Sequence, residues 1–172
     1  MKRRAVDARR RAASSRATKC MSARRFSLDS NLLVYIFDPR DPRKQSVAQQ
    51  VFAASTTRDC MIGLQTVSEF YTASTRKKIL PAGDAGREAR NFLAVFPTFQ
   101  ATANAHRIAA RDAVAGRFSY WDCVLLASAA EAGCATLLSE DMKDGAKLGA
   151  ITIRNPFGPT GLSAAAAAAL AP

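Results

Sequence analysis

Residues 26–37 read Phe-Ser-Leu-Asp-Ser-Asn-Leu-Leu-Val-Tyr-Ile-Phe, and this stretch decides the fold. Its first three residues predict a short buried strand over 26–28 that ends directly at Asp29. The apolar run that follows predicts a helix over 32–37. A strand that passes straight into a helix is the first unit of the alternating pattern of α/β proteins.

The same alternation continues along the chain. Further short strands are predicted over 60–63, 99–101, 135–138 and 151–153. Helices are predicted over 43–54, 65–78, 87–96, 104–115 and 120–132. The last of these is nearly all apolar, so we expect it to be buried on most sides. Short apolar strands alternating with helices indicate a mostly parallel sheet that is covered on both faces.

The length of 172 residues allows one compact domain, which we place at 26–158. No uninterrupted apolar stretch approaches the roughly 20 residues needed to cross a bilayer. Residues 159–172 contain the alanine run 164–169. Six alanines are too few to hold a helix alone in water, so we predict that this Ala-rich tail is disordered.

Residues 1–25 are rich in Arg, Ala and Ser without an apolar period, which predicts a disordered basic extension. Residues 1–20 carry eight Lys/Arg and one Asp, so +7 of the net charge of +11 lies there and +4 remains for the other 152 residues. Three interpretations stay open: a basic arm that touches nucleic acid, a transit peptide, or a stretch that precedes a natural start at Met21. The last is slightly favoured because structure-like sequence begins soon after Met21.

Cysteine and histidine usage excludes several metal sites. No two of the four cysteines form a C-x-x-C motif, so zinc is unsupported. Cys123 and Cys134 lie in apolar surroundings and are typical of small core residues in a reduced, cytoplasmic protein. His106 is the only histidine, which excludes a histidine-based metal site or a paired-histidine nuclease, and its predicted helical setting favours a structural role.

Acidic side chains gather where the predicted sheet should bind a ligand. In an open parallel sheet, ligands bind at the carboxyl ends of the strands. Asp29 and Asp141 follow two strands, Glu69 lies in the first two turns of the helix after another, and Asp122 lies in the first turn of helix 120–132. Such a carboxylate cluster has no matching Lys or His, so it needs a cation. Hard oxygen ligands predict Mg²⁺ or Mn²⁺ and phosphodiester hydrolysis.

Each acid also has a purely structural interpretation. Ser119 and Asp122 match the S-x-x-D capping box, in which the acid only satisfies a helix terminus. Asp29 could cap the following helix, Glu69 could be a surface acid, and Asp141 lies in a polar loop. The joint placement of the four acids is what favours a site.

Four segments together resemble the motifs of PIN-domain ribonucleases, and most closely the VapC toxins of bacterial type II toxin–antitoxin pairs. They are Leu-Asp-Ser-Asn-Leu-Leu-Val-Tyr at 28–35, Ser-Glu-Phe-Tyr at 68–71, Ser-Tyr-Trp-Asp at 119–122 and Leu-Ser-Glu-Asp-Met-Lys-Asp-Gly at 138–145. The resemblance extends from Phe26 to Phe157. It implies a PIN-like three-layer α/β sandwich, with a short, mostly parallel sheet flanked by helices.

The resemblance also implies roles for individual residues. The metal-holding catalytic acids would be Asp29, Glu69, Asp122 and Asp141. Their supporting residues would be Asn31, Ser139 and Asp144, with Glu140 a second choice for added charge. Lys/Arg side chains that follow the RNA backbone would come from 76–78 or from Arg40 and Arg43.

The function implied is that of an Mg²⁺- or Mn²⁺-dependent endoribonuclease that leaves a 5′-phosphate and a 3′-hydroxyl. Its partners would be RNA and a cognate antitoxin, with a homodimer and a cytoplasmic location expected. Two rivals remain. A haloacid-dehalogenase-type phosphatase needs a second Asp two residues after the first, where this chain has Asn31. A PIN-like scaffold or nucleic-acid-binding module without activity is the other.

Overall fold

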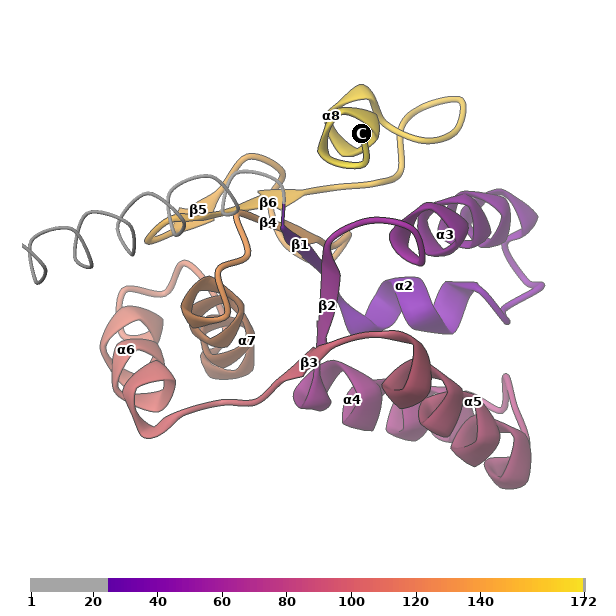
Figure 1. Cartoon of the computed structure of the whole chain (residues 1–172), viewed down its shortest axis with the longest axis horizontal. Coiled ribbons are helices and arrows are strands. Elements are labelled where there is room, and N and C mark those ends of the chain that lie inside the picture. The colour runs from indigo at the N-terminus through magenta and orange to yellow at the C-terminus, as the bar shows by residue number, and fades with distance from the viewer. Residues whose placement is uncertain (1–24, 172) are drawn as a thin grey trace, which may run out of the picture.

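A computed structural model describes residues 25–171, which form a six-stranded sheet between two layers of helices (Figure 1). The strands are β1 (Phe26–Leu28), β2 (Cys60–Gly63), β3 (Thr98–Phe99), β4 (Thr136–Leu138), β5 (Lys147–Leu148) and β6 (Ile151–Arg154). The helices are α2 (Ser30–Tyr35), α3 (Pro42–Ser55), α4 (Leu64–Arg76), α5 (Ala82–Val95), α6 (Ala103–Ala113), α7 (Tyr120–Glu131) and α8 (Ala164–Ala169). The predicted α/β class is confirmed.

The order of the strands positions the site. It runs β3-β2-β1-β4-β6-β5, and every neighbouring pair is parallel except β5 with β6. The chain moves from β1 outward to β2 and β3, then returns to the other side of β1 as β4. The pair β1–β4 is therefore the topological switch point, where open α/β sheets bind ligands. Leu28 lies opposite Leu138 in the register, so the residues that follow both strands meet.

Each face of the sheet has its own hydrophobic core. Helices α2 to α5 lie on one side in Figure 1, and α6 and α7 on the other. Successive strand residues point to opposite faces. Accordingly, Leu138 belongs to the core shared with α2, α3 and α4, while Leu137 belongs to the core shared with α6 and α7. This is the predicted three-layer sandwich.

Helix α7 is formed as its sequence predicts. Ser119 Oγ accepts a hydrogen bond from the Asp122 N–H at 3.2 Å, which begins the helix. Seven consecutive residues from Cys123 to Ala129 are buried, in keeping with the nearly apolar sequence. Gly133 ends it with a positive φ of 84°, a conformation that glycine adopts without steric cost.

The C-terminal prediction is wrong, because residues 164–169 form helix α8 and not a disordered tail. Ser163 Oγ accepts from the Ala166 N–H at 3.1 Å and caps the helix. Ala166 and Leu170 are buried in the core on the α3 side, and Arg58 Nε donates to the Leu170 carbonyl at 3.2 Å. The helix is not alone in water, so packing supplies the stability that six alanines lack.

Smaller differences concern boundaries. Helix α5 begins at Ala82, five residues before the predicted start, and the two-residue strand β5 was not predicted.

The predicted disordered extension 1–25 lies outside the described residues except for Arg25, whose Nε is 2.9 Å from the Asp59 carboxylate. Cys123 and Cys134 are free and buried, as predicted for core residues, and Cys60 is free and buried as well. Among residues 25–171, no helix combines the length and the apolar character that a membrane span requires.

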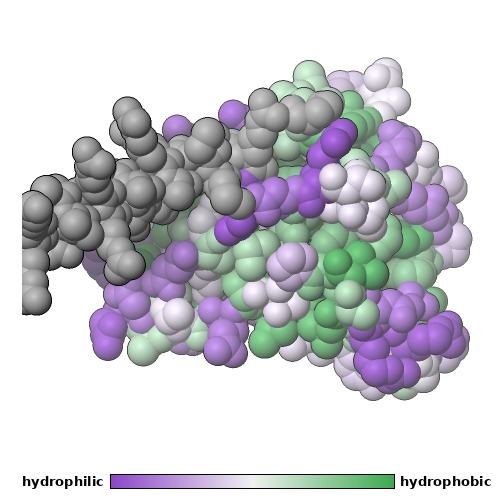
Figure 2. All heavy atoms as spheres, viewed as in Figure 1, coloured by the Kyte–Doolittle hydropathy of each residue, from purple (hydrophilic) through white to green (hydrophobic). Residues whose placement is uncertain are grey.

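Hydrophobic residues reach the surface between α3 and α5. Figure 2 shows them gathered at the middle of one face with hydrophilic residues around the rim. They surround a hollow of about 480 Å³ whose apolar walls include Phe37, Phe52, Phe92 and Val95. This hollow shares no lining residue with the groove at the carboxyl end of the sheet.

Candidate active site

Asp29 is buried at the centre of the sheet edge that is formed by the carboxyl ends of the strands. It follows β1 directly and is 7% exposed. One carboxylate oxygen, Oδ1, accepts from the Ser30 N–H at 2.6 Å, so Asp29 does cap α2. The other, Oδ2, accepts from Ser139 Oγ at 2.6 Å, a contact that the β1–β4 register makes possible. Asp29 therefore has both the structural role and the central position that its sequence context allowed.

The pKa of Asp29 is raised from 3.8 to about 6. Burial is the largest cause, because it removes water from the charged form. Hydrogen bonds from Ser139 and Ser30 lower the pKa in part, while the charges of Glu69 and Asp141 raise it further. The carboxylates at this edge are thus close enough to repel one another.

Asn31 connects three of the residues at the edge. Its Nδ2 donates to Asp29 Oδ2 at 3.2 Å, to Ser139 Oγ at 3.4 Å and to Asp141 Oδ2 at 3.1 Å. Its Oδ1 is buried and has no hydrogen-bond partner in the part of the chain that the structure describes. A buried acceptor without a partner points to a ligand or water that completes the site.

Asp141 and Ser139 come from the loop after β4. Ser139 is fully buried, and its Oγ also accepts from the Asp141 N–H at 3.2 Å, so one hydroxyl fixes both the loop and Asp29. Asp141 itself is exposed and forms part of the wall of two adjoining hollows.

Glu69 lies across the groove on α4, where a residue that the sequence did not single out holds it. Gln65, one turn earlier, donates from Nε2 to Glu69 Oε1 at 2.8 Å and to the Trp121 carbonyl at 3.2 Å. Gln65 therefore links the helix that carries Glu69 to the helix that carries Asp122. The i,i+4 spacing of Gln65 and Glu69 was the available signal, whereas the contact with Trp121 has none in the sequence.

Asp122 is placed as a helix cap and in the wall of a second hollow. Its Oδ2 accepts from the Ser119 N–H at 3.3 Å, which completes the capping box. It also lines a hollow of about 330 Å³ together with Asp141, Lys143 and Arg117. The structural interpretation of Asp122 is thus correct, and it does not displace the functional one.

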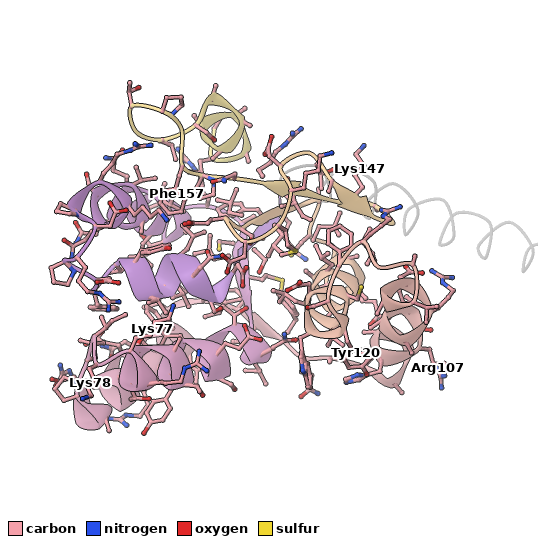
Figure 3. All side chains as sticks on the ribbon, turned by 180° about the vertical axis from the view of Figure 1, so that it is seen from behind. Lys77, Lys78, Arg107, Tyr120, Lys147 and Phe157 are labelled. Carbon is pink, nitrogen blue, oxygen red and sulfur yellow. The ribbon has the colours of Figure 1, made fainter. Side chains whose placement is uncertain are left out.

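The main groove has a volume of about 760 Å³. Its walls include Asn31, Glu69, Asp141, Trp121 and two cations, Arg76 and Lys77. Figure 3 shows Lys77 at the end of α4 and Tyr120 at the start of α7. The groove thus has acids near the sheet and a basic end, formed by Arg76 and Lys77, at the C-terminal end of α4.

Two residues that the sequence placed near the site are engaged elsewhere. The carboxylate of Asp144 accepts from the Asn155 N–H at 2.9 Å and lies 3.9 Å from Arg154, so it fixes the loop before β5 and adds no charge beside Asp29. Glu140 forms an ion pair with Lys44, which also donates to Tyr35 Oη at 3.2 Å. Asp144 is thus held by a backbone N–H with Arg154 nearby, and Glu140 is held by Lys44.

Of the Lys/Arg side chains that were expected to follow the RNA backbone, some line the groove and others are engaged elsewhere. Arg76 and Lys77 line the groove. Arg40 is paired with Asp38 at 2.7 Å, and Arg43 donates to the Gly158 carbonyl. Only the pair at the end of α4 is therefore positioned to meet a ligand in the groove.

The donors suit a hard divalent cation, although they are not gathered as ready ligands. Carboxylates, a serine hydroxyl and the unpartnered Asn31 Oδ1 are the oxygen donors that Mg²⁺ and Mn²⁺ take. No three acidic, Cys or His side chains within residues 25–171 converge as a metal cluster. Glu69 accepts a hydrogen bond from Gln65 and Asp122 accepts one from the Ser119 N–H, so both carboxylates are engaged by protein donors.

Comparisons with known proteins concern the family and the fold of the chain. Residues 27–143 match the family described as PIN domain. No curated protein sequence matches the chain.

Three solved structures share the fold. VapC20 of Mycobacterium tuberculosis, described as a sarcin-ricin loop cleaving toxin, is 16% identical with a TM-score of 0.54, over 70% of this chain and 90% of that one. A toxin–antitoxin complex from Klebsiella pneumoniae is 18% identical with a TM-score of 0.56, over 76% of this chain and 97% of that one. VapBC2 from Rickettsia felis, bound to a DNA fragment from its promoter, is 12% identical with a TM-score of 0.56, over 76% and 98%.

Proposed function

Because the chain belongs to the PIN domain family, we propose that it is a metal-dependent endoribonuclease that hydrolyses RNA phosphodiester bonds. One observation carries the proposal. Asp29 is buried at the switch point of the sheet, Glu69 and Asp141 raise its pKa, and no cation within residues 25–171 pairs with it. A bound cation would relieve the repulsion between these carboxylates.

Asp29, Glu69, Asp122 and Asp141 would hold Mg²⁺ or Mn²⁺. When bound, the metal would supply a Lewis acid for the phosphate and acidify an attacking water. The remaining work falls to residues of this chain. Ser139 and Ser30 orient the Asp29 carboxylate from two sides.

The basic end of the groove would receive the substrate. Arg76 and Lys77 lie on the same groove as Asn31 and Glu69, so their charges would attract and align RNA phosphates. The products expected from in-line attack of water are a 5′-phosphate and a 3′-hydroxyl.

The biological role that we propose is that of a toxin with a cognate antitoxin, since one of the similar structures is described as a toxin–antitoxin complex and another as a toxin. An antitoxin segment with an Arg or Lys would occupy the acidic edge, where a cation relieves the repulsion between carboxylates. We also propose a homodimer and a cytoplasmic location, which the free, buried cysteines support.

A metal titration tests the proposal. Mn²⁺ should bind the purified protein in calorimetry, and RNA cleavage should be absent in chelator and return with Mn²⁺ or Mg²⁺ but not with Ca²⁺, whose looser coordination positions water poorly. Asp29→Asn should remove cleavage and weaken Mn²⁺ binding. The matched control is Asp144→Asn, which changes an acid of the neighbouring loop that lies outside the site. A native protein that binds RNA but neither binds Mn²⁺ nor cleaves would instead be a scaffold module.

A further inference from the structure

A lysine on α3 reaches the loop after β4, which carries two residues of the candidate site. Lys44 forms an ion pair with Glu140. In the chain, Glu140 lies between Ser139 and Asp141. Ser139 Oγ donates to Asp29 at 2.6 Å and accepts from the Asp141 N–H at 3.2 Å. The ion pair therefore acts on a residue whose two neighbours both belong to the site.

Two aromatic rings enclose the ammonium group of Lys44. Its Nζ lies 4.9 Å from the Tyr35 ring centroid and 5.7 Å from that of Phe157. The two rings pack edge-on with centroids 5.5 Å apart, and Figure 3 shows Phe157 beside α3. Only 31% of the Lys44 side chain and 21% of the Glu140 side chain are exposed. Water and salt screen such a pair less than one on the open surface, so it can hold a loop in place.

The two charges of this pair depend on each other. The pKa of Lys44 is raised above its ordinary value, and the hydrogen bond to Glu140 is the largest cause. Lys44 is therefore positively charged at neutral pH. Glu140 Oε1 accepts from Lys44, while its Oε2 is buried without a hydrogen-bond partner among the described residues. A half-buried carboxylate that loses the cation beside it is unfavourable, so loss of Lys44 should displace Glu140 towards water and move the loop with it.

We propose that Lys44 is a positioning residue of the candidate site, because through Glu140 it holds the loop that carries Asp141. This inference rests on the proposed function and adds to it a residue outside the set of metal ligands. Groups that fix metal-binding side chains set their geometry before the metal arrives. Asp141 has the greatest need of such support, because it is exposed and lies in a loop, whereas Asp29 directly follows a paired strand.

The surroundings of Lys44 argue against direct contact with RNA. Its ammonium group is already bonded to Glu140 and donates to Tyr35 Oη at 3.2 Å. Tyr35 lines the main groove, and the cations that line it, among the residues that the structure describes, are Arg76 and Lys77. Lys44 therefore contacts a residue of the groove wall without being part of the wall.

Hydrogen exchange in chelator tests the contact between Lys44 and the loop without any metal. Lys44→Met keeps an unbranched side chain and removes the charge. In this variant, the amides of residues 139–142 should lose protection, among them the Asp141 N–H that is bonded to Ser139 Oγ. Glu140→Gln, which leaves α3 untouched, should have the same effect. Lys44→Arg should retain the protection, because a guanidinium can pair with both oxygens of a carboxylate.

Mn²⁺ titration tests whether the position of the loop matters to the site. In calorimetry, Lys44→Met and Glu140→Gln should each lower the Mn²⁺ affinity about 10-fold, an effect typical of residues that support metal ligands. The double variant should lose no more than either single one, because both changes break the same pair. In cleavage assays, the Mn²⁺ concentration for half-maximal rate should rise about 10-fold while KM for RNA stays unchanged.

The matched control is the ion pair between Arg25 and Asp59, at the other end of β1. The Arg25 side chain is 28% exposed, which is close to the value for Lys44. Arg25→Met should leave the exchange of residues 139–142 and the Mn²⁺ affinity unchanged. If it lowers the Mn²⁺ affinity as much as Lys44→Met does, the effect is general destabilisation and the inference is wrong.

The outcomes separate this inference from the proposed function. If the native protein neither binds Mn²⁺ nor cleaves RNA, the proposed function fails, and the exchange measurement still decides whether Lys44 holds the loop. Unchanged exchange of residues 139–142 in Lys44→Met overturns the inference even if the native protein cleaves RNA. Lost protection with full Mn²⁺ affinity would make the pair purely structural, and a raised KM for RNA with full Mn²⁺ affinity would make Lys44 a substrate contact. Either result also overturns it.

Discussion

The Asp29 carboxylate is buried beside other carboxylates, and this environment has consequences for folding as well as for chemistry. Its pKa is about 6 in the folded protein against 3.8 when free of its surroundings. Between these values the folded state binds more protons than the unfolded state. The metal-free protein should therefore lose stability as the pH rises from about 4 to about 6, with the full loss, roughly 3 kcal/mol from Asp29, present at higher pH.

Asp29→Asn should remove this penalty. In chelator at pH 8, we expect the free energy of unfolding of the variant to exceed that of the native protein by about 1–3 kcal/mol, because the buried amide carries no charge. Its oxygen can still accept from the Ser30 N–H, and its Nδ2 can donate to Ser139 Oγ. The gain should shrink towards zero near pH 4. Urea unfolding at several pH values measures both quantities. A variant that is less stable than the native protein at pH 8 would show that the carboxylate is held favourably without a metal.

Asp122 allows its two roles to be separated. Asp122→Asn keeps an oxygen at the helix start, so we expect a stability cost of about 1 kcal/mol or less together with a loss of cleavage by orders of magnitude. Ser119→Ala removes the partner of the cap and should cost about 1 kcal/mol, yet retain most cleavage well below the melting temperature. Thermal unfolding and a cleavage assay on both proteins decide the point. Full activity of Asp122→Asn would leave Asp122 with the capping role alone.

Some residues of the site were visible in the sequence and others were not. Asp29 and Asp141 follow strands, and the resemblance added Asn31 and Ser139, whose contacts with Asp29 are now seen. The ion pair between Lys44 and Glu140 joins positions 96 residues apart, so no local pattern could reveal that Glu140 is occupied. Whether an acid in a polar loop is available to a site depends on whether a distant residue forms an ion pair with it.

At the scale of elements, local patterns predicted those that can be stabilised locally. Helix α7 has its own capping box and an apolar run, and strand β2 has the predicted bounds. Helix α8 and strand β5 exist only through tertiary contacts. The two residues of β5 pair antiparallel with β6, and Leu170 beyond α8 is buried against a distant part of the chain. Alanine has the highest helix propensity, but a run of six is too short to form a helix without tertiary packing, so the local sequence did not predict α8.

Helix α8 should therefore contribute to stability from one face only. Ala166 is fully buried, whereas Ala168 is exposed on the same helix. Ala166→Asp places a charge in an apolar core and should lower the free energy of unfolding by about 3 kcal/mol or more. Ala168→Asp introduces the same residue in water and should cost less than about 1 kcal/mol. Urea unfolding compares the pair, and equal effects would mean that α8 does not pack on the core in solution.

At the scale of the whole molecule, the charge is divided between two regions. Residues 1–20 hold +7 of the net +11, while the acids of the site lie in the domain that holds the rest. The strand order brings those acids to one edge, and the cations Arg76 and Lys77 share the groove with them. The groove that we propose as the RNA site is therefore formed by the domain without residues 1–20, so the RNA affinity of the two regions can be measured separately.

Deletion of residues 1–20 should leave folding and cleavage intact. These residues have no hydrophobic period, so we expect the thermal midpoint to move by no more than about one or two degrees and the cleavage rate at saturating RNA to persist.

If the segment is a basic arm, RNA affinity should fall, and the slope of log affinity against log salt should become shallower by about 0.7 for each RNA phosphate that the segment neutralises. If it is a leader or precedes the natural start, the slope should not change. Scanning calorimetry and anisotropy titrations over a salt series measure these effects. Loss of solubility or a large drop in the midpoint would contradict the domain boundary, because it would mean that the basic segment contributes to the core.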